Sequence, residues 1–109
     1  MRQAYAHDAV LTMPPGADGR APGGAITTAL CGHWDHEPPC PLAPHHTAVA
    51  RNGEQVRLRI LFATEPHRAG KVRERIDAAL AAGNWELVSS GCAPVAPEER
   101  DHARRLLRS

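Results

Sequence analysis

Prolines between residues 34 and 46 constrain the fold of this chain more than any other feature. A proline lacks a backbone N–H and has a fixed φ, so it cannot occupy a central strand or the interior of a helix. Four of them interrupt this short stretch: Pro38, Pro39, Pro41 and Pro44. The segment 34–46 is therefore predicted to be a long loop, with regular elements only before and after it.

Two strands are predicted before this loop. The segment Asp8–Met13 is short and largely apolar, and the run 14–24 is dense in proline and glycine. Such a run is typical of a turn or loop. In Ala25–His33, apolar and small residues alternate with the period of a strand, with Ile26 and Leu30 on one face. The two segments are expected to pair as a hairpin with a long connection.

A second hairpin is predicted directly after the proline-rich loop. Asn52-Gly53 separates the segments Thr47–Arg51 and Glu54–Ala63, and this dipeptide is the strongest short-range signal for a hairpin. Apolar residues of the second arm alternate with Arg57 and Arg59. One face of this strand is therefore expected in the core and the other at least partly in water.

After Thr64 the apolar spacing becomes helical. Thr64 can cap a helix, and a stripe of apolar residues follows on one face: Val72, Ile76, Ala79 and Leu80. Gly83-Asn84 is expected to end this helix. A strand is predicted over Trp85–Cys92 and a last helix from Pro97 onward.

Together these elements predict a single α+β domain over residues 1–109. Its antiparallel-dominated sheet has about five strands, and two helices pack on one face of the sheet. The strands and the proline-rich loop occupy residues 8–63, and a helix-strand-helix unit occupies 64–109.

Composition removes several functional classes. The net charge is only +1, which removes the strongest electrostatic argument for nucleic acid or a membrane surface as partner. No segment is apolar and long enough to cross a bilayer, and the N-terminus lacks the apolar stretch of a secretory signal. We therefore expect a soluble cytoplasmic protein. The excess of arginine over the single lysine suggests a GC-rich bacterial genome.

Metal-ligating residue types are concentrated in and around the proline-rich loop. In the reducing cytoplasm, cysteines are more often metal ligands than disulfide partners. The candidate ligands are Cys31, His33, His36, Cys40, His45 and His46. Cys31 and His33 are expected to share one face of a strand, whereas only one of the adjacent His45 and His46 can point to that side. The segment is therefore predicted to bind a metal ion.

A mixed Cys/His set suits Zn²⁺ at about 2.0–2.3 Å, and the same donors would accept Cu or Ni. The density of ligands carries this prediction, because their spacing matches no zinc-finger pattern. The alternative without metal is a buried thiol at Cys31 and solvated histidines.

Three functions remain open for such a site. A closed four-ligand shell would stabilise the fold or a partner surface. An open shell would make a metal-dependent enzyme, with Glu37 or Asp35 as general base and with Arg57 and Arg59 orienting a small anionic substrate beneath Trp34. Metal buffering or delivery is the third. The wet sheet face also leaves a homodimer open.

Overall fold

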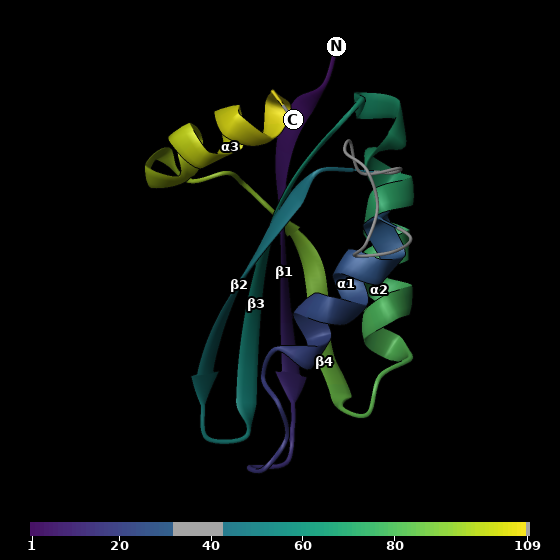
Figure 1. Cartoon of the computed structure of the whole chain (residues 1–109), viewed down its shortest axis with the longest axis vertical. Coiled ribbons are helices and arrows are strands. Elements are labelled where there is room, and N and C mark those ends of the chain that lie inside the picture. The colour runs from purple at the N-terminus through teal and green to yellow at the C-terminus, as the bar shows by residue number, and fades with distance from the viewer. Residues whose placement is uncertain (32–42, 109) are drawn as a thin grey trace.

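A computed structural model gives the structure of the chain, and it describes residues 1–31 and 43–108. These residues form four strands and three helices (Figure 1). They are β1 (Gln3–Thr12), α1 (Ala21–Cys31), β2 (His45–Asn52), β3 (Gln55–Thr64), α2 (Ala69–Ala81), β4 (Glu86–Ala93) and α3 (Arg100–Leu107). Short 3-10 turns, Pro66–Arg68 and Pro97–Glu99, precede α2 and α3.

The strands form one antiparallel sheet in the order β2-β3-β1-β4. Because β1 pairs with β3 and β4, each β-α-β unit has a third strand inserted between its two strands. This is the split βαβ, ferredoxin-like topology, with α3 added after its last strand. The predicted α+β class and the antiparallel sheet are confirmed.

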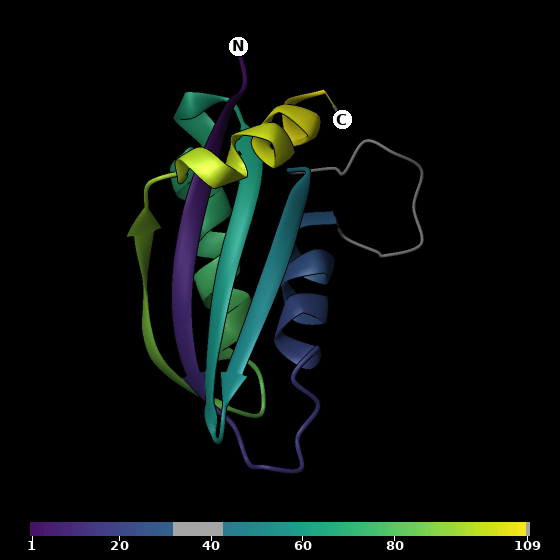
Figure 2. The ribbon, with the colours of Figure 1, turned by 90° about the vertical axis from the view of Figure 1, so that its left-hand side faces the viewer.

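The number of strands and the placement of the helices differ from the prediction. The helices α1 and α2 cover one face of the sheet, which we call the helix face, whereas α3 lies against the opposite face (Figure 2). On that opposite face, which we call the open face, α3 covers only one end of the strands. The described residues therefore place two helices on one face of the sheet and a third helix on the other face, whereas the prediction had two helices on a single face.

The strand predicted over 25–33 is wrong, because Ala21–Cys31 is helical. Pro22, Ile26 and Leu30 are all buried, and their spacing of four residues forms a helical stripe. Ile26 and Leu30 are four residues apart, so they would also share one face of a strand. Their spacing therefore could not distinguish a strand from a helix. Pro22 lies in the first turn of α1, where its missing N–H costs nothing. The end of the predicted segment, residues 32 and 33, lies outside the described residues.

The hairpin predicted around Asn52-Gly53 is confirmed. β2 and β3 pair in unbroken register from His45↔Phe62 to Asn52↔Gln55. Gly53 opens the turn with φ +64°, a value that residues with a Cβ rarely adopt. Of the predicted loop 34–46, residues 34–42 lie outside the described part, and His45 and His46 already belong to β2.

The two faces of the sheet have separate apolar cores. The helix face buries a large core around Leu11, Ile26, Phe62 and Ile76. On the open face, Ala6, Leu61, Ala63 and Leu106 form a small cluster beneath α3. Beside this cluster, between β1, β3 and β2, the open face has a hollow of about 370 Å³.

Candidate functional site

His45 is the predicted ligand whose surroundings the structure defines best. It opens β2 and is half-buried on the helix face, where its ring reaches α1. Its Nδ1 lies 3.2 Å from the carbonyl oxygen of Ala43. Since a carbonyl can only accept, Nδ1 carries the proton of the neutral ring and Nε2 has the lone pair. Burial lowers the pKa of His45, and the nearby His46 lowers it further, against the opposing effect of the Ala43 carbonyl.

The Nε2 atom of His45 lies 3.2 Å from the hydroxyl oxygen of Thr27 on α1. That hydroxyl also lies 3.1 Å from the carbonyl oxygen of Gly23. Because a threonine hydroxyl has one proton, these two acceptors share it. The contact joins the middle of α1 to the start of β2, the two elements that flank residues 32–42.

Cys31 is the last residue of α1. It follows Thr27 by four positions, so position 31 falls on the stripe of α1 that includes Thr27. The helix therefore brings position 31 to the side where His45 lies. The other predicted residues of this segment lie outside the described part of the chain: His33, Trp34, Asp35, His36, Glu37 and Cys40.

His46 points away from this junction. His45 pairs with Phe62 of the helix face, whereas His46 pairs with Leu61 of the open face. There the His46 ring packs against His102 of α3, with 4.4 Å between ring centroids and 51° between ring planes. One metal site therefore cannot include both histidines, in agreement with the expected opposition of adjacent strand residues.

Among residues 1–31 and 43–108, no three His, Cys, Asp or Glu side chains are placed to hold a metal ion together. A complete shell around His45 would need ligands from Cys31 and from residues 32–42. The described residues thus supply one oriented histidine and the position of one cysteine.

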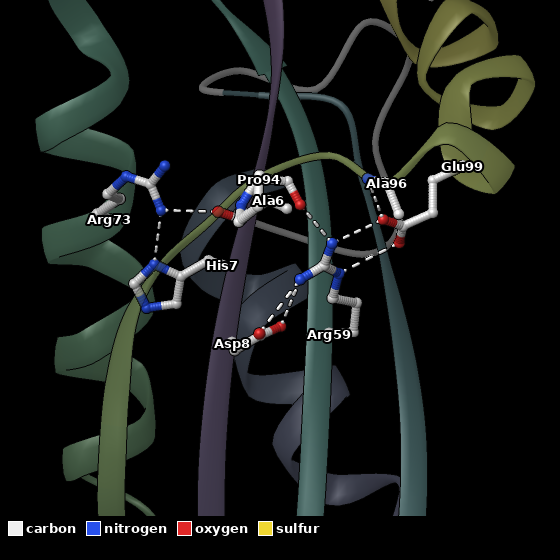
Figure 3. A network of polar contacts seen from close by, with 8 residues as sticks. All are labelled: Ala6, His7, Asp8, Arg59, Arg73, Pro94, Ala96 and Glu99. Carbon is white, nitrogen blue, oxygen red and sulfur yellow. Dashed lines mark hydrogen bonds and ion pairs between the residues drawn. The ribbon is translucent and has the colours of Figure 1, made fainter.

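The two arginines predicted to bind an anion lie on the open face beside the hollow. Arg59 is already neutralised by two carboxylates, with Nη1 3.0 Å from Asp8 and Nη2 2.7 Å from Glu99 (Figure 3). Its Nη2 also donates to the carbonyl of Pro94 at 2.6 Å. Arg57 is exposed and has no ion pair among the described residues. Of the pair, Arg57 alone has a charge left for an anion.

A buried polar cluster on the helix face was not predicted. His7 is 2% exposed and lies among β4 and α2. Its Nδ1 is 2.9 Å from Arg73 Nη1, and its Nε2 is 2.6 Å from Ser90 Oγ and 3.2 Å from Asp77 (Figure 3 shows the Arg73 contact). The Ser90 hydroxyl donates to Asp77 in turn. The only signal in the sequence is a polar residue at a core position of the β1 alternation.

These residue types resemble a hydrolytic triad, but their protons are placed otherwise. The Arg73 guanidinium can only donate, so His7 Nδ1 is the acceptor and Nε2 carries the proton. A general base for Ser90 needs a lone pair on the nitrogen that faces it. The cluster therefore joins β1, α2 and β4 and does not activate a serine.

No protein-family model matches this chain, and no curated protein shows significant sequence similarity to it. In the part of the chain that the structure describes, none of the helices has the length and apolar character needed to span a bilayer. A fold of this topology hosts many unrelated activities, so function must be argued from the site.

Proposed function

We propose that this protein binds a transition metal ion, with zinc favoured and Cu or Ni as alternatives, where α1 meets β2. Cys31 and His45 would contribute from the described elements, and His33, His36 and Cys40 would supply the remaining ligands from the segment between them. His46 is left out of this set because it points to the other face.

The observation that carries this proposal is the orientation of His45. A metal-ligating imidazole usually donates its second ring N–H to a carbonyl or carboxylate, which fixes the tautomer. In His45 this acceptor is the carbonyl oxygen of Ala43, 3.2 Å from Nδ1, so the lone pair of Nε2 faces α1. The lowered pKa of His45 keeps the ring neutral near pH 7, as metal ligation requires.

A structural role is the form of this proposal that the geometry favours. A metal ion held by Cys31 and His45 would join the end of a helix to the start of an edge strand, at the longest connection between described elements. Chelation at such a site can contribute on the order of 10 kcal/mol to folding. Catalysis with Glu37 or Asp35 as base, and metal buffering or delivery, are the alternative functions.

The test is elemental analysis of the full chain purified without an affinity tag. We expect about one transition metal ion per chain, and Cys31→Ser and Cys40→Ser should each lower the metal content and the melting temperature. Cys92→Ser is the matched control, because Cys92 is an exposed free thiol on β4, away from the junction. Wild-type protein that is folded, metal-free and unchanged in stability by added zinc would refute the proposal.

A further inference from the structure

The open face has two adjoining hollows, on the side of the sheet opposite His45. The hollow of about 370 Å³ between β1, β3 and β2 is the larger, and we call it the large hollow. A second one of about 130 Å³, the small hollow, lies beside it at the hairpin end of β2 and β3. Ala50 and Arg57 line both, so Arg57 stands where the two hollows meet.

The pairing of β2 with β3 explains these hollows. On the open face Ala48 lies beside Arg59, and Ala50 lies beside Arg57. Two short side chains of β2 therefore flank two long ones of β3, and α3 covers only the other end of these strands (Figure 2). The arginine side chains extend beyond the alanines and leave space above β2.

The large hollow suits an apolar group. Its floor includes the side chains of Val10, Ala48 and Ala50, which share the open face. Two of its charged residues already neutralise each other, because Arg59 Nη1 lies 3.0 Å from the carboxylate of Asp8. An apolar ligand can therefore lie on this floor without separating a charged group from its partner.

The small hollow, by contrast, is polar and positively charged. The described residues that line it are Ala50, Arg51, Asn52, Gln55 and Arg57, and none of them is acidic. Arg57 is exposed and has no ion pair among the described residues. Arg51 donates to the carbonyl oxygens of Pro14 and Ala17, both at 2.7 Å. These neutral acceptors hold the Arg51 guanidinium in place and leave its charge uncompensated, so the small hollow suits an anion.

The residues that flank the segment 32–42 lie on the other side of the sheet. The helix α1 precedes this segment on the helix face, and Ala43, which follows it, is fully buried in the helix-face core. The described chain therefore reaches both ends of the segment on the helix face, whereas both hollows open on the opposite side.

We propose that the two hollows together bind a small organic carboxylate, with its carboxylate on Arg57 in the small hollow and its apolar body in the large one. A guanidinium can bind a carboxylate through two parallel hydrogen bonds. The volume of about 370 Å³ falls within the roughly 300–1,000 Å³ of small-molecule sites. The proposal goes beyond metal binding and is independent of it, because His45 faces the opposite side of the sheet.

The test is an NMR titration of the isotope-labelled full chain with octanoate, which carries both a carboxylate and an apolar chain. We expect saturable binding with a Kd of about 1 mM or below. The largest shifts should appear at the amides of Ala48, Ala50 and Arg57. Acetate lacks the chain and 1-octanol lacks the charge, so each should bind at least about tenfold more weakly than octanoate.

Two variants separate the hollows. Arg57→Met should weaken octanoate binding by about tenfold or more, because it removes a charge-assisted contact, and it should not weaken 1-octanol. Ala48→Ile fills part of the large hollow, so it should weaken octanoate and leave acetate unchanged. Arg75→Met is the matched control for Arg57→Met: Arg75 is an exposed arginine of α2, on the helix face, and its loss should leave octanoate binding unchanged.

All three variants change exposed side chains, so each should keep the wild-type circular dichroism spectrum. Absence of saturable octanoate binding would overturn the proposal. Equal affinity for 1-octanol and octanoate would overturn it too, because the arginine would then contribute nothing. So would an Arg57→Met variant that binds octanoate as tightly as Arg75→Met, or shifts confined to the helix-face core.

Discussion

The guanidinium of Arg73 donates to Nδ1 of His7 at 2.9 Å, and this contact fixes the protonation of a buried histidine. The same Nη1 atom donates to the carbonyl of Ala6 at 3.0 Å. On the other side of the ring, Nε2 is left to donate to Ser90, 2.6 Å away. A second proton on the ring would have to displace the arginine, so the geometry favours the neutral imidazole.

Stability should therefore fall in mild acid. Burial is the largest influence on His7 and lowers its pKa from 6.5, the adjacent Arg73 lowers it further, and the carboxylates of Asp77 and Asp8 act in the opposite direction. The unfolded chain thus takes up this proton at a higher pH than the folded chain. The contribution is complete above pH 6.5 and is lost as the pH falls through 6.5 towards the folded pKa.

Urea unfolding at about pH 8 and about pH 5.5 would measure this loss. His45 and His102 also have lowered pKa values, so His7→Gln should reduce the pH dependence without abolishing it. An NMR titration of the wild-type chain gives a second measurement, in which the His7 resonance should titrate below 6.5. A titration above that value would contradict the assignment.

The Arg59 side chain should hold α3 on the open face. It donates to Glu99 at the start of α3, to Asp8 of β1 and to the carbonyl of Pro94, and Glu99 also accepts the N–H of Ala96 at 2.9 Å. Arg59→Met should cost about 1–3 kcal/mol, because partly buried charged groups lose their partner. Amide exchange in α3 should speed up more than exchange in α2.

Arg57→Met is the matched control for this experiment. Arg57 lies two residues away on the same face, is exposed and has no ion pair among the described residues. Its replacement should change stability by no more than about 0.5 kcal/mol. Arg59→Lys should rescue only part of the loss, since an ammonium group cannot donate in the fixed fork of a guanidinium. Equal losses of stability from Arg59→Met and Arg57→Met would show that the contacts of the Arg59 side chain contribute nothing to stability.

Two glycines should respond oppositely to alanine. A Cβ at Gly83 would overlap the ring of Trp85, which is held in place by a 2.6 Å hydrogen bond from its indole N–H to the carbonyl of Leu80. Gly83→Ala should therefore destabilise the protein by about 1–3 kcal/mol. Gly70 lies in α2 with open space around it, so Gly70→Ala should stabilise by about 0.5–1 kcal/mol. Thermal unfolding of the two variants measures both signs.

Substitutions of the two adjacent histidines of β2 should have different effects on the metal content. His45 faces α1 and His46 faces α3, so His45→Gln should lower the metal content and His46→Gln should leave it unchanged. Elemental analysis of the two variants, purified side by side, gives the comparison. Loss of metal from His46→Gln alone would move the site to the open face and exclude Cys31 from it.

The parts of the fold that could be predicted are those with a local physical cause. Asn52-Gly53 specifies its turn through the positive φ of Gly53, and the stripe Val72, Ile76 and Leu80 specifies α2 through its period. In α1, by contrast, Ile26 and Leu30 satisfy both periods. The helix there follows from topology: β1 and β2 run parallel with β3 between them, and parallel strands need a crossover.

The candidate site could be predicted only as a set of residue types. The sequence shows that His45 and His46 cannot share a side, but the choice of His45 depends on its contact with Thr27, eighteen positions earlier. The ion pairs of Arg59 could not be predicted either, because Asp8 comes from β1 and Glu99 from the 3-10 turn that precedes α3. Such contacts depend on the assembled sheet and not on local sequence.

The central position of β1 has a consequence for the order in which the chain folds. Its neighbours β3 and β4 both come later, with Thr12 pairing to Gln55 and Ala6 to Ala93. During synthesis β1 therefore has no strand to pair with until the β2–β3 hairpin has been made. We expect this hairpin to form early, because closing its turn costs little chain entropy, and β1 to insert beside it afterwards. Substitutions in the Gly53 turn should then slow folding, whereas substitutions in β4 should mainly speed unfolding.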